Sequence, residues 1–349
     1  MQLRTTTIGS YPKPPGAPVP MWSEMGERRR GAPTEVYDGI VERLMPDDKR
    51  TLDRMTIDAV REQVECGITI PTDGEIRREH YVYYHCRQIS GIDFHRLTER
   101  SMRDGSWTAR VPTVRASLAA GPAFLVDDWR EAQSATDRDV KITVPGPLTI
   151  SDTIANEHYP DRVSLARALA DVLNVEIRRL ADAGCRWIQV DEPLFARQVD
   201  SALAFGIECL ERCFAGSPPG LNRAVHICCG YPSGLDQPHP AKADAASYFA
   251  LAGPLDRASV DAVSIEDAHR HNDLSLLEAF KSTRVMLGLI DIAKSAVEPV
   301  DTIRERLRAA LEHIDADRLI AAPDCGLALL PRHLAVAKLR NLAAAARDI

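Results

Sequence analysis

The chain has 349 residues and a net charge of −7, from 43 basic and 50 acidic side chains. Apolar residues make up 45% of it and charged residues 27%, the balance of a globular protein rather than of a disordered or fibrous one. The mild acidity argues against a nucleic-acid partner, because a general nucleic-acid binder needs a basic stripe to neutralise phosphates.

The sequence has no stretch of about 18 apolar residues, so we expect no transmembrane helix and no membrane partner. Residues Met1–Thr7 lack the apolar core of a signal peptide, and we expect a cytoplasmic protein. Eight cysteines in a chain this long do not indicate a disulfide framework. In a reducing compartment they would be buried apolar residues, metal ligands or reactive thiols.

Short β-rich runs alternate along the chain with stretches of helical periodicity. The helical spacing is clearest at 52–64, 165–180, 303–314 and 333–345. Gly67 and Gly184 stand where a left-handed residue would end a helix just before a strand. The predicted strands are Arg4–Ser10, Ile68–Thr72, Val140–Val144, Trp187–Val190, Ala224–Cys228, Ala262–Ile265, Val285–Ile290 and Leu319–Ala322.

Strands that alternate with helices predict an α/β fold built from parallel βαβ units. Eight strands would close a (β/α)8 (TIM) barrel, and the length suits such a barrel with elaborated loops. Two modest domains or a doubly wound sheet are the alternatives. A doubly wound sheet usually carries a glycine-rich phosphate turn, and neither G-x-G-x-x-G nor G-x-x-x-x-G-K-[ST] occurs here.

Two segments interrupt the alternation. Residues 13–45 open in a proline cluster, and we predict an irregular N-terminal arm or lid there. Residues 80–138 are rich in glycine turns, and we predict an inserted loop region above the barrel with a small hairpin. Neither segment is typical of a linker, so residues 1–349 are predicted to form a single barrel domain.

Polar residues follow nearly every predicted strand. Barrel enzymes place their chemistry at the C-terminal ends of the strands, although polar residues at these positions also cap the following helices. Because so many strand ends agree, we predict a polar active site at this face. The strand ends are Gly9-Ser10, Asp73-Gly74-Glu75, Pro145-Gly146-Pro147, Asp191-Glu192-Pro193, His226-Ile227-Cys228-Cys229, Glu266-Asp267, Asp291 and Asp324-Cys325-Gly326.

Within this set His226, Cys228, Glu266 and Cys325 form a candidate metal site. A His-x-Cys pair on an extended strand places both side chains on one face, and zinc accepts imidazole, thiolate and carboxylate ligands together. Each residue taken singly is more simply a buried thiol or a hydrogen-bonded core residue. The four taken together favour a metal. Cys229 competes for the ligand role, but strand alternation points it to the opposite face.

The other cysteines stand in helical, loop-edge or pre-strand contexts and are predicted to be packing residues. They are Cys66, Cys86, Cys185, Cys209 and Cys213. His269 and His271 follow Glu266, either as donors to the metal ligands or, more simply, as solvated loop residues.

A zinc site with two thiolates suits the activation of a thiol substrate, because zinc lowers the pKa of a thiol that it binds. Glu75 and Asp191 stand at neighbouring strand ends, where they are placed to hold an ammonium group of the same substrate. The alternative for Asp191-Glu192-Pro193 is a helix-entry turn.

These motifs resemble the catalytic C-terminal barrel of the cobalamin-independent methionine synthase family. The matches follow the family order from residue 5 to residue 327, so the resemblance covers almost the whole chain. Each motif alone is weak, and the set is highly specific. The matching stretches are Thr5–Pro12, Asp73–Arg78, Gly146–Ile150, Ile188–Pro193, His226–Cys228, Ser264–Glu266 and Ala322–Leu327.

The resemblance implies a (β/α)8 barrel that binds Zn2+ and transfers a methyl group to a zinc-held sulfur, that of homocysteine in the methionine synthases. It implies metal ligands at the four residues of the candidate metal site. It implies substrate contacts at Ile8, Gly9 and Ser10, with Glu75 and Asp191 binding the amino group.

Several departures concern the methyl donor. We expect no second, N-terminal barrel of the kind found in the long folate-using enzymes. Thr153 stands near the position of the family's folate-stacking tryptophan, Arg197 at that of a folate-contacting glutamate, and Ala293 at that of the proton-donating histidine. Single-barrel relatives are thought to take the methyl group from a methylated corrinoid or another donor, so a corrinoid and a folate both stay open.

The leading hypothesis is a zinc-dependent methyltransferase acting on a small thiol, with Asp291 and His269 as candidate proton sources. A second hypothesis keeps the zinc and the thiol but opens an epoxide, as the epoxyalkane–coenzyme M transferases of this superfamily do. A third is a catalytically silent barrel that only binds zinc. A barrel of the uroporphyrinogen decarboxylase type is a distant fold alternative that has no need of the His-Cys-Glu-Cys set.

Overall fold

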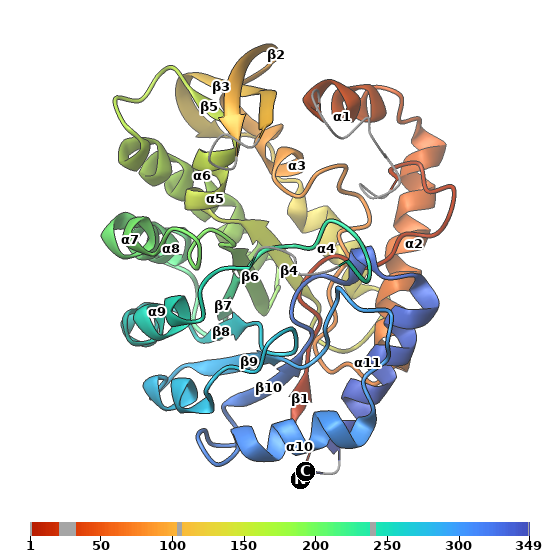
Figure 1. Cartoon of the computed structure of the whole chain (residues 1–349). Helices are drawn as coiled ribbons and strands as arrows, with labels where there is room; N and C mark the ends of the chain where they lie inside the picture. The colour runs from red at the N-terminus through yellow and green to blue at the C-terminus, as the bar shows by residue number, and fades with distance from the viewer. Residues whose placement is uncertain (1, 21–32, 103–106, 238–241, 348) are drawn as a thin grey trace.

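The computed structural model describes residues 2–20, 33–102, 107–237, 242–347 and 349. Its centre is a curled parallel sheet of seven strands, in the order β1-β10-β9-β8-β7-β6-β4, with helices packed around it (Figure 1). The strands are β1 (Arg4–Thr5), β4 (Lys141–Pro145), β6 (Trp187–Asp191), β7 (Asn222–Ile227), β8 (Ala262–Ile265), β9 (Arg284–Gly288) and β10 (Leu319–Ala322).

Residues 70–72 occupy the eighth position, between β1 and β4. Thr6 forms a parallel bridge with Ile70, and Thr72 forms another with Lys141 of β4. The predicted strand Ile68–Thr72 makes isolated bridges rather than a ladder because Pro71 has no N–H to donate, although its carbonyl accepts the Lys141 N–H at 2.8 Å. The predicted α/β barrel is confirmed, with seven hydrogen-bonded strands and this bridging segment.

Threonine side chains hold the seam between β1 and the bridging segment. The Thr6 hydroxyl donates to the Ile70 carbonyl at 2.8 Å, and the Thr5 N–H donates to the Thr69 hydroxyl at 2.7 Å. Side-chain hydrogen bonds therefore supplement the few backbone bonds at this seam.

The outer helices contain three of the four predicted helical stretches, and the fourth, 303–314, runs past the end of its helix at Ala310. Gly67 and Gly184 adopt positive φ of 96° and 109°, as predicted for residues that end a helix. No helix in the described residues is long and apolar enough to cross a membrane. The helices are α2 (Pro46–Glu65), α5 (Pro147–Thr153), α6 (Arg162–Asp182), α7 (Val199–Ser201), the π-helix η2 (Ala202–Gly206), α8 (Ile207–Phe214), α9 (Ala246–Arg257), α10 (Val300–Ala310), α11 (Arg332–Arg347) and the 3-10 turns η3 (Leu274–Ala279) and η4 (Leu327–Leu329).

The predicted inserted region is more ordered than a loop. It contains α3 (Tyr83–Cys86), the antiparallel strands β2 (Ile89–Met102) and β3 (Trp107–Ala120), and α4 (Leu125–Gln133). The hairpin is therefore larger than predicted, with 14 residues in each strand, and β3 also pairs with β5 (Ala155–Asn156).

The predicted arm 13–45 contains one helix, α1 (Pro33–Val41), while residues 21–32 lie outside the described part of the chain. Thr34 of α1 donates its hydroxyl hydrogen to the Arg110 carbonyl of β3 at 2.8 Å, and Arg110 pairs with Glu35 at 2.9 Å. The helix thus lies beside the hairpin (Figure 1).

The barrel interior changes from apolar to polar along its axis. Eight buried apolar residues form a floor: Ile8, Ile70, Trp187, Ala224, Ala262, Met286, Ile320 and Ala322. Alternate strand residues point the same way, so Gln189, His226 and Ser264 follow on the same inward face. All three are buried. This polar layer supports the site at the strand ends.

Candidate active site and metal centre

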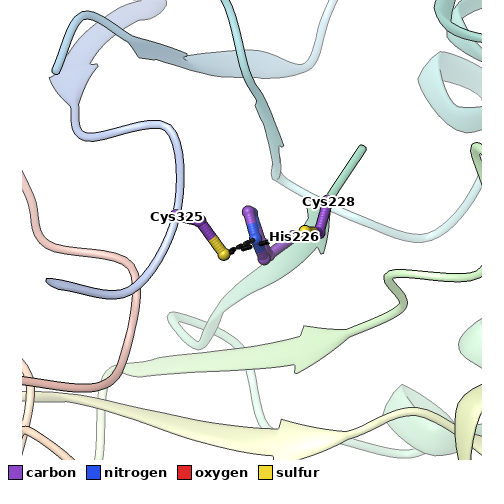
Figure 2. A group of neighbouring side chains, drawn as sticks. All are labelled: His226, Cys228 and Cys325. Carbon is purple, nitrogen blue, oxygen red and sulfur yellow. Dashed lines mark hydrogen bonds between the residues drawn. The ribbon is translucent and has the colours of Figure 1, made fainter. Parts of the chain in front are cut away.

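Three of the predicted metal ligands point toward one another. Figure 2 shows His226 and Cys228 at the end of β7 and Cys325 in the loop after β10. His226 Nε2 lies 3.3 Å from Cys325 Sγ, and the two sulfurs are 3.8 Å apart. The ligand atoms of all three lie within 4.8 Å of one another, and the side chains are buried.

The imidazole is held by its other nitrogen, since His226 Nδ1 lies 2.9 Å from the Ser264 hydroxyl of β8. This contact directs Nε2 toward the sulfurs, the usual way in which a neighbouring group orients a metal-binding histidine. The adjacent Cys325 thiol, burial and the Glu266 carboxylate raise the pKa of Cys228 well above its usual value. A bound cation would reverse this effect, because a metal deprotonates a thiol that coordinates it. The donor set therefore fits zinc.

The fourth predicted ligand, Glu266, lies beside this trio but has other partners. Its carboxylate accepts the Cys229 N–H at 2.8 Å and the Lys242 ammonium at 2.6 Å, and His269 Nδ1 lies 3.1 Å from it. In the structure Glu266 groups with Cys229 and His269 rather than with the trio. Its direct link to the trio is the N–H of Cys229, the residue that follows Cys228.

His269 bridges two carboxylates, with its Nδ1 3.0 Å from Asp324 and 3.1 Å from Glu266. Burial alone would lower the pKa of His269, but these carboxylates outweigh it and raise the pKa to about 9. Asp324 also accepts the backbone N–H groups of Asp267 and Ala268, each at 2.8 Å. Because Asp324 directly precedes Cys325, this network holds the loop that carries the second thiol.

Asp291, the other predicted proton source, lies apart from this network. Its carboxylate accepts the Ala293 N–H at 2.8 Å, its carbonyl accepts Lys338 Nζ at 3.1 Å, and its N–H donates to Glu298 at 2.9 Å. The hydrogen bonds of Asp291 within the described chain stay in its own loop and on α11. The structure does not bring it to the metal ligands.

The predicted substrate residues Ile8, Gly9 and Ser10 lie between Glu75 and the Cys325 loop. A β-carbon at Gly9 would lie 2.6 Å from Glu75 Oε1, and one at Gly326 would lie 2.2 Å from the Ser10 hydroxyl. A side chain at either position would displace the neighbouring side-chain oxygen. The structure thus brings together the segments that follow β1, the bridging segment 70–72 and β10.

Glu75 is held in a strained backbone conformation, with φ +55°, which side chains rarely adopt and which is common at functional sites. Its carboxylate accepts the Thr143 hydroxyl at 2.7 Å and pairs with Arg78 at 3.3 Å. Arg78 is almost fully buried and also donates to the Thr143 carbonyl at 2.9 Å. Sequence reasoning missed Arg78 as a site residue, although it lies within the matching stretch 73–78.

Asp191 ends β6 and pairs in register with His226 on β7. Its carboxylate accepts Gln189 Nε2 at 2.7 Å. Burial raises the pKa of Asp191 to about 6, with Glu75 adding to the effect and His226 opposing it. The next residue, Glu192, instead accepts the backbone N–H groups of Leu148 and Thr149 at the start of α5. Asp191 faces the interior, while Glu192 caps the start of α5, a helix that precedes it in the chain.

The remaining cysteines are packing residues, as predicted. All eight are free and buried. Cys229, the competitor for the ligand role, lies 3.1 Å from the Tyr248 hydroxyl and does not join the trio. His271 is exposed, as a solvated loop residue would be.

Comparison with known proteins places the chain in a family. Residues 3–203 and 247–348 match the family model of the catalytic domain of cobalamin-independent synthase. The chain belongs to this family. It is 31% identical to a methionine synthase of Sulfolobus acidocaldarius, over 97% of this chain and 90% of that protein, and 28% identical to one of Sulfurisphaera tokodaii over the same shares.

A solved structure agrees. A B12-independent methionine synthase from Shewanella sp., in complex with selenomethionine, matches with a TM-score of 0.84 and 30% identity over 99% of this chain and 97% of that one. The resemblance predicted from the motifs is confirmed. As a member of the cobalamin-independent synthase family the chain is a methyltransferase of the methionine synthase type.

Proposed function

We propose that the chain methylates the sulfur of homocysteine or a closely similar amino-acid thiol, with zinc as its metal. The observation that carries this proposal is the convergence of His226, Cys228 and Cys325 within 4.8 Å, next to the buried carboxylate Asp191. The relatives named methionine synthase support the choice of acceptor.

Zinc would be held by His226, Cys228 and Cys325, with Glu266 as the fourth ligand. When bound, zinc lowers the pKa of a substrate thiol, so that a thiolate nucleophile is available at neutral pH. Glu266 would have to turn from Lys242 and Cys229, its partners in the structure, toward the trio.

The chain's own residues would orient the substrate. Glu75 and Asp191 carry the negative charge that an ammonium group requires. Glu75 lies against Gly9, and Gln189, which donates to Asp191, also donates to the Ile8 carbonyl. A thiol fixed at both its sulfur and its amino group meets the alkyl carbon in one orientation, and such positioning supplies a large part of catalysis. Of the two predicted proton sources, His269 is the one joined to the ligand set, through Glu266.

The choice of methyl donor would depend on Thr153 and Arg197, which stand at the positions of the family's folate contacts. Thr153 donates its hydroxyl hydrogen to the Thr149 carbonyl of its own helix at 2.8 Å and has no ring on which a pterin could stack. Arg197 has no acceptor on its side chain for a pterin N–H. We therefore propose a methylated corrinoid ahead of a folate.

The test is metal analysis followed by product mass. Purified protein is expected to contain one zinc per chain and to form methionine from homocysteine faster with methylcobalamin than with methyltetrahydrofolate. A short epoxide serves as the third arm. A hydroxyalkyl thioether as the main product, or no turnover by the zinc-loaded protein on all three donors, would overturn the proposal.

A further inference from the structure

A lysine lies inside the barrel without a carboxylate partner. Lys141 begins β4, is 0% exposed, and makes no ion pair within the described residues. Its Nζ donates to Gln189 Oε1 at 2.6 Å, and its other polar neighbour is Met286 Sδ at 3.9 Å. Burying an unpaired ammonium is costly. Apolar residues form the floor around it, so filling this space does not require a charged side chain.

The lysine determines which way the Gln189 amide points. An ammonium can only donate hydrogen bonds, so the amide oxygen of Gln189 must face Lys141. The amide nitrogen then faces the strand ends, where it donates to Asp191 Oδ1 at 2.7 Å and to the Ile8 carbonyl at 2.8 Å. Gln189 is itself 0% exposed, so water does not offer it other partners.

We infer that Lys141 is a positioning residue for the amino-group site. It locks the Gln189 amide in the one orientation that holds the Asp191 carboxylate and the Ile8 carbonyl for the substrate. This inference rests on the proposed role of Asp191 in binding the substrate's amino group. Without the ammonium, the amide oxygen loses its buried hydrogen-bond donor, and the amide holds Asp191 and the Ile8 carbonyl less firmly.

The electrostatics agree with this arrangement. Burial lowers the pKa of Lys141 to about 7, and Asp191 is the charge that opposes this shift. The lysine therefore interacts with the carboxylate across the amide, and the three side chains behave as one unit from the barrel floor to the strand ends.

The test compares two ligands that differ only in the amino group. Calorimetry measures the Kd of methionine and of 4-(methylthio)butanoate for the protein as purified, with its zinc content determined. Hydrogen bonds to charged groups change affinity by about 10-fold to 100-fold. The wild type is therefore expected to bind methionine at least about 10-fold more tightly than 4-(methylthio)butanoate. In K141M this preference should fall by about 10-fold. The Kd of K141M for 4-(methylthio)butanoate and its zinc content should stay unchanged.

A matched control is K338M, which removes the other fully buried lysine, on α11, and is expected to keep the preference. If K141M folds poorly by circular dichroism, Q189L tests the same link and is expected to lose the preference as well. A K141M or Q189L protein that keeps the wild-type preference overturns the inference and leaves the proposed function standing. A wild type that shows no preference overturns the proposed amino-group site itself.

Discussion

The two sides of the active-site mouth differ in how closely they follow the family. On the acceptor side, at the ends of β7, β8 and β10, every implied metal ligand is present, and three of the four converge. On the donor side Thr153, Arg197 and Ala293 replace the three residues that the family resemblance assigns to folate and proton transfer. Ala293 is buried; its carbonyl accepts the Asp236 N–H at 2.7 Å and its own N–H donates to the Asp291 carboxylate at 2.8 Å.

The difference separates two parts of one reaction. In the proposed function, activation of the thiol depends on buried groups that the barrel holds in place, whereas the choice of donor depends on Thr153 at the end of α5 and on Arg197 and Ala293 beyond β6 and β9. A barrel of this kind can therefore keep its acceptor while its donor changes. Four predictions examine the acceptor side, from the largest expected effect to the smallest.

The largest effect is expected from Cys325→Ser. A hydroxyl is a poor zinc ligand beside a thiolate, so zinc content should fall below one tenth of the wild type and methyl transfer should fall at least about 100-fold. Metal analysis after dialysis measures the zinc content, and mass spectrometry of the product measures methyl transfer. Cys209→Ser, a buried thiol on α8, is the control and should keep its zinc. Equal zinc retention by both variants would contradict the assignment.

Lys242→Met tests whether Glu266 belongs to the metal site. In the metal-free protein the change leaves a fully buried carboxylate without its ammonium, which should lower the free energy of unfolding by about 3 kcal/mol. With zinc bound the cation takes over the charge of Glu266, and the loss should shrink to less than half. Chemical denaturation of the metal-free and the zinc-bound protein gives the two free energies of unfolding to compare. The same loss in both would show that Glu266 does not reach the metal.

Glu75→Gln keeps the size of the side chain and removes its charge. The KM for homocysteine should rise about 10-fold, because a charged hydrogen bond is replaced by a neutral one. The zinc content should not change, since Glu75 contacts Thr143 and Arg78 rather than the ligands. A fall in kcat with an unchanged KM would instead give Glu75 a role in the chemical step.

The smallest effect concerns pH. Because burial raises the pKa of Asp191 to about 6, the carboxylate is protonated below that pH, and methionine binding should weaken by up to about 10-fold per pH unit. The same shift makes the neutral acid the form that favours folding. Its contribution to stability is present below about pH 4 and lost as the pH rises through 6. Asp191→Asn should bind weakly at every pH, and a pH dependence like that of the wild type would disprove the assignment.

Much of the fold could be predicted from strand and helix periodicity. The strands at 187–190 and 262–265 agree with the structure to within a residue, because each is a short, continuous buried run between clear turns. The strand at 68–72 is reduced to two bridges, since one proline within it removes a donor. The hairpin β2–β3 was underestimated because its strands carry many charged residues and lack regular alternation.

The part of the site that could be predicted from the sequence is the part where residues with metal-binding side chains stand at a regular spacing. The spacing of His226 and Cys228 on one strand was enough to place both on the same face. The partners Lys242 and Lys141 were not predictable, because each contacts a residue far along the chain. Arg78 stands only three residues from Glu75, but its contact with Thr143 was not predictable. Which residues these side chains contact depends on distances in the folded protein, and the periodicity of the sequence does not encode those distances.

The pairing of the first strand with the last sets the order in which the molecule can assemble. Arg4 of β1 lies opposite Ile320 of β10, so nearly the whole chain separates two neighbours in the sheet. Contacts of such long range form late, since the loop between them must first be ordered. Ser10 and Gly326 meet just beyond this junction. During synthesis on the ribosome, the pocket would therefore come into being only after the final strand has emerged, and a chain stopped before β10 would be a sheet without an active site.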